Sequence, residues 1–394
     1  MVGEPFPLTL DPLPARSRLS TLPRRVLVLA GLADSLINFR KPLLKAFREK
    51  GLEVIAFAPP TDPVIMEELN DIGVDFQAVR LSRAGTNWVD DAGYCLELRS
   101  RIRQVKPDLV FSYAIKPVIY GSLAARACGV NQVVSMITGA GYAFQKSSWK
   151  GKAVHAIVRP MYRMALASND VVFFQNRDNL ALFREEGILQ DPRKAVLIPG
   201  SGVDLFHFAP VVPWTRPVTF LLIGRLLYDK GIGEYVEAAR ALKAMYPEAR
   251  FRLQGPFDPN PTGIPRSVVE EWRHEGVIEY LPETRDVRPS LAETSVYVLP
   301  SYHEGMPRTV LEAMSMGRPI ITTDAPGCRD TVIQGKNGYI VPVKDSKALS
   351  HAMERFLIDP SLIHGMGVLS RSLAEERFDA RKVNSIILSC LGIS

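Results

Sequence analysis

Two glutamates, Glu304 and Glu312, stand out in this chain because a local pattern surrounds them. Residues 296–299 are an apolar run, a polar loop follows, and the apolar residues after the loop recur at helical spacing. Carboxylates accept hydrogen bonds from hydroxyl groups, so two of them near one strand end could hold a polyhydroxylated ligand. Isolated glutamate pairs are usually solvated surface, but the flanking strand and helix favour a binding site.

The same loop also predicts an anion site. Gly305 allows the backbone to come close to a ligand, and Pro307 suits the first helical position, where its missing N–H costs nothing. The free N–H groups at a helix start point outward, and the helix dipole adds about half a positive charge there. A sugar nucleotide presents both hydroxyls and a diphosphate, so this stretch predicts a site for such a ligand.

A second group of residues lies at 222–233. An apolar strand ends at Gly224, Arg225 and Lys230 flank the next loop, and Gly231 and Gly233 open a helix. Arginine offers a planar fork of donors and lysine a compact charge, so the pair could clamp a diphosphate. The alternative is two surface cations near a helix start.

Strands that alternate with helices must position these residues. The first half of the chain has apolar strand patterns at 25–31, 53–58, 75–80, 108–113, 132–136, 170–174 and 194–198, with helical patterns at 36–50, 88–105 and 151–167. The pattern restarts after a proline-rich linker, with strands at 218–223, 249–254, 277–281, 296–299 and 320–322. Alternation of this kind predicts doubly wound parallel sheets, whose ligands bind at the carboxyl ends of the strands.

We therefore expect an α/β protein of two Rossmann-like domains facing across a cleft. A length of 394 residues is too great for one ordinary core and suits two domains. The expected divisions are a disordered arm at 1–24, an N-terminal Rossmann-like domain at 25–205, a C-terminal domain at 206–378 that binds the sugar nucleotide, and a helix at 379–394 that packs back on the N-terminal domain.

Composition excludes several classes of protein. Hydrophobic residues make up 46% of the chain and charged residues 23%, as in ordinary globular proteins. No apolar run reaches the roughly 18 residues of a membrane-spanning helix. The proline- and arginine-rich first 24 residues favour a disordered arm over a signal peptide. The four cysteines are scattered without metal-site spacing, which favours a reduced, cytosolic protein.

The net charge of +6 is unevenly distributed. Residues 1–205 carry 26 Lys and Arg against 20 Asp and Glu, whereas residues 206–394 carry 22 of each. Residues 145–163 are basic, and Phe144 and Trp149 beside them could anchor the chain at an anionic membrane surface. An ordinary amphipathic helix with a solvated basic face explains the pattern equally well. Nucleic acid is a less favoured partner, because no binding motif accompanies the charge.

Longer motifs add a family resemblance. GRLLYDKG at 224–231, the segment at 300–330 and NGYIVPVKD at 337–345 resemble the second domain of retaining GT-B glycosyltransferases of family 4. The resemblance implies catalytic roles for Glu304, Arg225 and Lys230. It also implies that the nucleotide-sugar donor contacts a larger set of residues: Gly224, Gly255, Leu281, Gly305, Met306, Pro307 and Glu312.

The first half resembles a narrower group. SLINFRKPLL, FSYAIKPVIYGSLAAR and ITGAGYAF are similar to segments of bacterial enzymes that extend undecaprenyl-diphosphate-linked sugars. A lipid-linked saccharide is then the expected acceptor, at the inner face of the cell membrane. Many members of the wider family have a histidine after the fourth strand, where this chain has Lys116 nearby. We expect acceptor contacts in these segments and after the first strand: Gly31, Ser35, Arg40, Lys116 and Gly139.

The expected reaction transfers a hexose or N-acetylhexosamine from a UDP-sugar, with retained configuration and without a metal. The chain has no Asp-x-Asp motif to bring a divalent cation to the diphosphate, and Arg225 and Lys230 could neutralise the leaving phosphate instead. Two other functions stay open. A sugar-nucleotide epimerase of the same fold would release UDP without an acceptor, and a silent nucleotide-sugar-binding subunit would not turn over.

Overall fold

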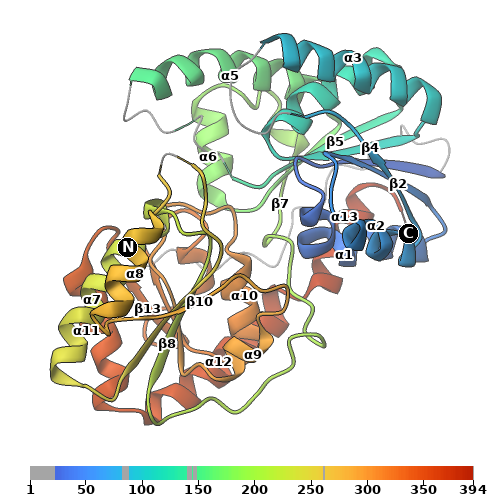
Figure 1. The fold of residues 1–394 in the computed structure, drawn as a ribbon. Helices are drawn as coiled ribbons and strands as arrows, with labels where there is room; N and C mark the ends of the chain where they lie inside the picture. Colours follow the sequence, from blue (N-terminus) through green and yellow to red (C-terminus); the bar gives the residue numbers. More distant parts are fainter. Residues whose placement is uncertain (1–22, 82–87, 140–143, 145–148, 261, 394) are drawn as a thin grey trace. The chain divides into compact units, whose positions relative to one another are not determined.

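The computed structural model describes residues 23–81, 88–139, 144, 149–260 and 262–393 (Figure 1). These residues form two compact units, one of residues 23–201 with 380–393 and the other of residues 202–379. The chain therefore passes between the units twice. Nearly all of the arm predicted at 1–24 lies outside the described residues.

The first unit contains a parallel seven-stranded sheet. In spatial order its strands are β3 (Val74–Ala78), β2 (Glu53–Ala58), β1 (Arg25–Leu29), β4 (Leu109–Tyr113), β5 (Gln132–Ile137), β6 (Val171–Phe174) and β7 (Ala195–Leu197). Val26 and Val28 of β1 point into one buried cluster, and Leu27 and Leu29 point into another on the opposite face. A strand covered on both faces needs a continuous apolar run, which is why β1 reads RVLVL.

Helices cover both faces of this sheet. The first cluster includes residues of α1, α2 and α13, and the second includes residues of α3 and α4. Within the described part of the chain, none of the helices has the length and apolar character needed to cross a membrane. The helical segments of the first unit are α1 (Asp34–Glu49), α2 (Pro63–Asp71), α3 (Trp88–Val105), the π-helix η1 (Pro117–Gly121), α4 (Ser122–Ala127), α5 (Trp149–Ala167), α6 (Arg177–Glu185), η3 (Pro192–Lys194) and α13 (Ala380–Cys390).

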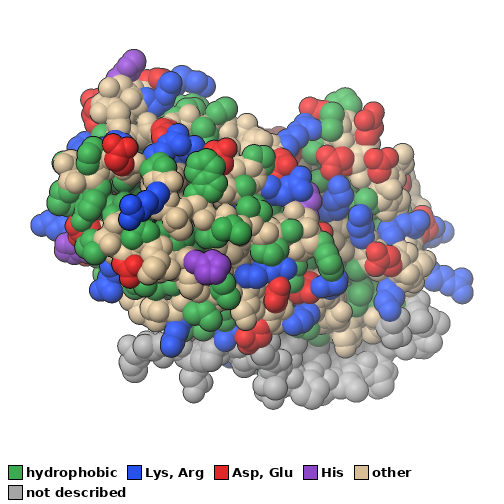
Figure 2. Space-filling model, turned by 90° about the horizontal axis from the view of Figure 1, so that it is seen from below, with side chains coloured by type: hydrophobic (Ala, Val, Ile, Leu, Met, Phe, Trp, Pro, Cys, Tyr) green, Lys and Arg blue, Asp and Glu red, His purple; other side chains and the backbone are tan. Residues whose placement is uncertain are grey.

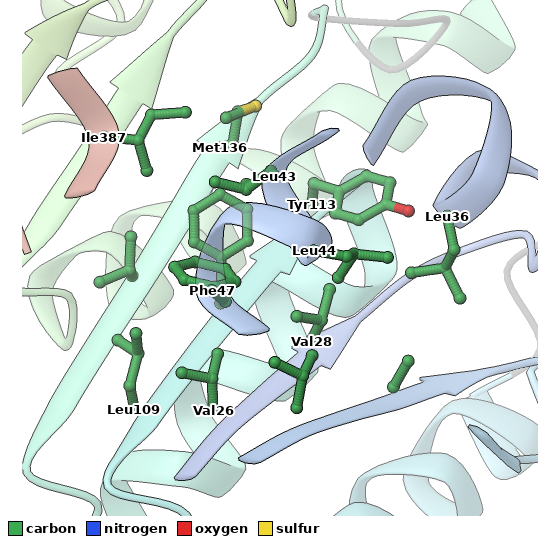
Figure 3. Close-up of a cluster of buried hydrophobic side chains, with 14 of the residues drawn as sticks. Val26, Val28, Leu36, Leu43, Leu44, Phe47, Leu109, Tyr113, Met136 and Ile387 are labelled. Carbon is green, nitrogen blue, oxygen red and sulfur yellow. The ribbon is translucent and has the colours of Figure 1, made fainter. Parts of the chain in front are cut away.

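The last helix, α13, belongs to the core of the first unit, although the whole of the other unit, residues 202–379, separates it from the rest of the first unit in sequence. Figure 3 shows Ile387 of α13 in the same buried cluster as Phe47 of α1, Val26 of β1 and Leu109 of β4. Val383 and Ile387 are almost fully buried. Burial of each such side chain contributes about 1.5–3 kcal/mol. Hydrophobic packing therefore holds the C-terminal segment on this sheet.

The second unit contains a parallel six-stranded sheet. In spatial order its strands are β10 (Glu279–Leu281), β9 (Arg250–Gln254), β8 (Thr219–Ile223), β11 (Val296–Leu299), β12 (Ile320–Thr323) and β13 (Gly338–Val341). Its helical segments are η4 (Tyr228–Lys230), α7 (Ile232–Met245), α8 (Arg266–His274), α9 (Arg288–Ala292), α10 (Arg308–Ser315), η5 (Arg329–Thr331), α11 (Ser346–Ile358) and α12 (Ser361–Arg377).

Both sheets have the strand order of a Rossmann-like domain, which confirms the predicted fold class. In each, the chain moves outward from a central strand, β1 or β8, and then returns to that strand's other side with β4 or β11. The order reverses there, and ligands bind at the carboxyl ends of the strands beside such a switch point. In the second unit, these ends carry the loops at 224–231 and 300–307.

The structure adds elements that the sequence patterns missed. Strand β13 and helices α2, α6, α8, α11 and α12 had no predicted counterpart. The prediction for Pro307 was off by one position. Helix α10 begins at Arg308, and Pro307 is the residue before it, with a ψ of 102° that is extended and not helical.

Gly231 and Gly233 provide a test of the turn that precedes α7. Gly231 has a φ of 71°, and a Cβ there would lie 2.1 Å from the carbonyl oxygen of Pro300, whereas a Cβ at Gly233 has no neighbour within 4 Å. We expect Gly231→Ala to lower the free energy of unfolding by more than about 1 kcal/mol through strain and collision. Gly233→Ala, within the helix, should leave it unchanged or higher. Denaturant titration of both variants measures this, and equal stabilities would contradict it.

Candidate functional site

The carboxyl edge of the second sheet brings three of the predicted donor-binding positions together. The Gly224 N–H donates to the Gln254 carbonyl at 3.0 Å, and the Gly255 N–H donates to the Leu281 carbonyl at 3.3 Å. Gly255 has a φ of 144°, and a Cβ there would lie 2.0 Å from the Gly224 oxygen. Gly224, Gly255 and Leu281 therefore follow one another across the ends of β8, β9 and β10.

Lys230 and Glu304, predicted as catalytic residues from separate motifs, form an ion pair. Both side chains are mostly buried, with 20% and 15% of their surface exposed. The loops that carry them are joined by their backbones as well, because the Tyr302 N–H donates to the Asp229 carbonyl at 3.0 Å. The structure thus places the 224–231 loop directly against the 300–307 loop.

Arg225, the third predicted catalytic residue, is held by an acid that the sequence analysis did not find. Its Nη1 lies 2.7 Å from Oδ2 of Asp258, in the loop after β9. The arginine side chain is 55% exposed, whereas that of Asp258 is 13% exposed. The mostly buried aspartate therefore holds one nitrogen of the guanidinium, while more than half of the arginine side chain stays exposed.

Glu312 lies in the second turn of α10 and is buried. Its Oε1 accepts from Nε of Arg308, one turn earlier, at 2.7 Å. Burial raises the pKa of Glu312, and the positive charge of Arg308 opposes that rise. The i,i+4 spacing of the two residues could have revealed this partner from sequence.

A loop after β12 supports the backbone of Glu304 and Gly305. The Glu304 N–H donates to the Pro326 carbonyl at 3.0 Å. Gly327 has a φ of 74°, and a Cβ there would lie 2.5 Å from the Gly305 oxygen and 2.7 Å from the Glu304 oxygen. Only a glycine allows this contact without strain, so the support fixes where the loop before α10 runs.

Together these contacts make a site suited to an anion that also carries hydroxyl groups. Arg225 and Lys230 supply positive charge, and the N-terminus of α10, which has no side-chain cap, adds the positive end of its helix dipole. Glu304 and Glu312 supply carboxylate oxygens that can accept hydrogen bonds from hydroxyls. The geometry supports grouping these residues, while the role of each one stays a prediction.

Four of the five predicted acceptor residues of the first unit fall into two groups. Ser35 Oγ lies 2.8 Å from the Tyr113 hydroxyl, and the guanidinium of Arg40 lies over the Tyr113 ring, 4.7 Å from its centre. Arg40 is almost fully buried and donates to Ser201 Oγ at 2.5 Å. Gly31 lies nearby, because a Cβ there would be 3.2 Å from that of Ala114. These residues form one network at the ends of β1 and β4.

Lys116 belongs to a different network. Its Nζ lies 2.7 Å from Oδ1 of Asp91 in α3, and the Tyr120 hydroxyl donates to the other carboxylate oxygen at 3.0 Å. Both charged side chains are mostly buried. Lys116 is thus ion-paired, as Lys230 is with Glu304, and its role as a phosphate contact stays a prediction. Gly139 follows β5 with a φ of 142°.

The predicted membrane anchor falls partly outside the described residues, which do not include 145–148 or the side chain of Trp149. Phe144 is half-buried, and its ring stacks on Phe183 at 5.3 Å and also contacts Tyr162. This ring packs within the first unit, so the structure does not support Phe144 as a projecting anchor. Figure 2 shows a face on which Lys and Arg are interspersed with acidic and apolar side chains.

Glu312→Gln tests the cost of burying a carboxylate at this site. Because burial raises the pKa of Glu312, its ionised form is less favourable in the folded protein than in the unfolded chain. The penalty is absent below the ordinary glutamate pKa of about 4.3 and complete above the raised pKa. We therefore expect the variant to gain Tm relative to the wild type as pH rises through this window. Thermal unfolding at several pH values measures the difference, and a constant difference would contradict it.

Comparison with known proteins now gives the family. Residues 40–200 match the family described as Glycosyl transferase 4-like domain, and residues 217–359 match Glycosyl transferases group 1. An N,N'-diacetylbacillosaminyl-diphospho-undecaprenol alpha-1,3-N-acetylgalactosaminyltransferase of Campylobacter jejuni is 27% identical over 86% of this chain and 90% of its own. A UDP-Gal:alpha-D-GlcNAc-diphosphoundecaprenol alpha-1,3-galactosyltransferase of Escherichia coli is 26% identical over 70% of this chain and 72% of its own.

Solved structures share the fold at lower identity. Sucrose-phosphate synthase of Thermosynechococcus elongatus superposes with a TM-score of 0.77 at 20% identity, covering 93% of this chain and 98% of that one. Anabaena HepE in complex with UDP and glucose gives a TM-score of 0.76 at 16% identity, covering 94% and 99%. The chain therefore belongs to the glycosyltransferases of GT-B fold, with a glycosyl transferase 4-like domain followed by a group 1 domain.

Proposed function

We propose that this glycosyltransferase moves a hexose or N-acetylhexosamine from a UDP-sugar to a lipid-diphosphate-linked saccharide, with retained configuration. The observation that carries the proposal is the ion pair of Lys230 and Glu304 beside Arg225 and the start of α10. One cation clamp and two carboxylates on adjacent strand ends match the diphosphate and hydroxyls of one nucleotide sugar.

The leaving diphosphate determines the roles of the cations. As the bond between the sugar and the diphosphate breaks, negative charge grows on the departing oxygen. Arg225 and Lys230 stabilise that charge together with the N–H groups at the start of α10. Glu304 then accepts hydrogen bonds from the donor sugar, and Glu312 accepts from the ribose hydroxyls. The backbone of Gly305, Met306 and Pro307 faces the sugar and phosphates.

Retention follows when the acceptor attacks from the face that the diphosphate leaves. The acceptor hydroxyl forms the new bond there, and an oxygen of the departing diphosphate takes its proton. The names of the Campylobacter and E. coli relatives both state an alpha-1,3 product. Common UDP-hexoses carry the sugar in α linkage, so an α product from such a donor retains configuration.

The same relatives support the acceptor class, because both names contain a diphospho-undecaprenol saccharide. An enzyme with a lipid-linked acceptor meets that acceptor at the surface of a membrane. We propose a peripheral location on the inner face of a bacterial membrane, where the excess positive charge of residues 1–205 would favour anionic lipid. Acceptor contacts in the first unit then involve Gly31, Ser35, Arg40, Lys116 and Gly139.

Variants of the cation and the acid test this assignment. We expect Lys230→Ala and Glu304→Ala each to lower kcat by about 100-fold, the effect of removing one group that stabilises the transition state. Glu248→Gln, an exposed carboxylate between α7 and β9, is the control and should keep full activity. The assay follows radiolabelled sugar from UDP-sugars into undecaprenyl-diphosphate-linked saccharide. UDP release that does not depend on acceptor would instead favour the epimerase, and unchanged turnover in both variants would refute the site.

Metal independence has its own test. Because Arg225 and Lys230 can neutralise the diphosphate, we expect excess EDTA to leave the transfer rate within about twofold of the untreated enzyme. The rate with added Mg²⁺ or Mn²⁺ should be the same. A loss of activity that either ion restores would contradict metal independence without affecting the proposed transfer.

A further inference from the structure

Tyr297, in the middle of β11, is buried inside the second unit with no exposed surface. From sequence it is an ordinary aromatic core residue. Its hydroxyl, however, lies 3.1 Å from the carbonyl oxygen of Ile223 and 2.6 Å from Oγ1 of Thr309. A phenol can donate one hydrogen bond and accept others, so it can serve both partners at once.

The two partners come from the two segments that carry the site. Ile223 is the last residue of β8 and is followed by Gly224 and Arg225. Thr309 lies in the first turn of α10, just after the loop of Glu304. A single buried hydroxyl therefore joins the start of the cation loop to the start of the helix.

The sheet itself does not make this connection. Strands β8 and β11 pair only at Phe220 with Val296 and at Leu221 with Tyr297, whereas β8 pairs with β9 as far as Ile223. The ladder between β8 and β11 thus stops before the carboxyl end of β8. At this switch point of the sheet the two strands are no longer paired. The Tyr297 hydroxyl contacts one group on each side of the gap, the Ile223 carbonyl and the Thr309 hydroxyl.

The surroundings of the hydroxyl keep it neutral. Burial raises the pKa of Tyr297, and the hydrogen bonds with Thr309 and Ile223 offset only part of that rise. At neutral pH the phenol therefore retains its proton.

We propose that Tyr297 is a positioning residue, whose hydroxyl sets the spacing between the Arg225 loop and the start of α10 and so shapes the diphosphate subsite. The inference rests on the proposed function, because it takes that subsite to bind the nucleotide. The tyrosine itself does not touch the ligand and acts through the two backbone segments that it joins.

Tyr235 of α7 offers a matched control. It is also fully buried in this unit, and its hydroxyl lies 3.1 Å from the carbonyl oxygens of both Phe220 and Arg252. Those carbonyls belong to the interiors of β8 and β9, where the ladder is complete. Replacing either tyrosine with phenylalanine thus removes a buried hydroxyl with two partners, but only Tyr297 connects the loops of the site.

The experiment compares Tyr297→Phe with Tyr235→Phe in the full chain. Calorimetry measures the affinity for UDP, and denaturant titration measures the free energy of unfolding. Steady-state assays with the UDP-sugar give the kinetics of transfer. We expect similar losses of stability in both variants. Only Tyr297→Phe should weaken UDP binding and raise KM for the UDP-sugar, by about tenfold or more, because displaced contacts at a site cost this much. Tyr235→Phe should bind UDP as the wild type does.

A double-mutant cycle sharpens the result. Thr309→Val removes the second hydroxyl, and if the two hydroxyls act as one unit, the variant carrying both substitutions should bind UDP no more weakly than Tyr297→Phe alone. Additive losses, or equal UDP affinities for Tyr297→Phe and Tyr235→Phe, would overturn the inference. A wild-type protein that binds no UDP would instead refute the proposed function and this inference together.

Discussion

The site in the second unit depends on backbone segments that approach more closely than any side chain would permit. Gly231 lies against Pro300, Gly255 against Gly224, and Gly327 against Gly305. Each of these glycines has a positive φ, and each contact joins loops that follow different strands. A Cβ at any of these positions would separate the loops or strain the turn. The spacing of the charged groups is therefore set by backbone contact before any side chain is considered.

Charge balance is the second constraint on this site. Lys230 pairs with Glu304, Arg225 with Asp258, and Arg308 with Glu312, so the acids and cations largely compensate one another. The mostly buried charges among them, those of the Lys230–Glu304 and Arg308–Glu312 pairs, are costly when they lose a partner. An incoming diphosphate would have to compete with Glu304 and Asp258 for their cations. Arg225 is the most exposed of the three cations, so it can turn toward a ligand at the smallest cost.

The first unit has the same type of strand order as the second, but different side chains lie at the carboxyl ends of its strands. Buried polar groups there hydrogen-bond to one another, as Ser35 does with Tyr113 and Lys116 with Asp91. In the first unit Arg40 lies over the ring of Tyr113, whereas in the second unit Arg225 and Lys230 pair with Asp258 and Glu304. Fold alone does not decide what such an edge binds, because the side chains at the strand ends differ.

The sequence by itself determined the features that have local causes. Continuous apolar runs predicted the central strands, and Gly231 and Gly305 marked turns beside charged residues, so the motifs containing Arg225, Lys230 and Glu304 were visible without coordinates. Their partners were visible only where the spacing was local, as for Arg308 one turn before Glu312. Only the tertiary structure showed that Asp258 pairs with Arg225, that Asp91 pairs with Lys116, and that the Tyr297 hydroxyl connects two segments of the site. These contacts join segments far apart in the chain, and their pairing depends on strand order and on where each ladder ends, which no local pattern encodes.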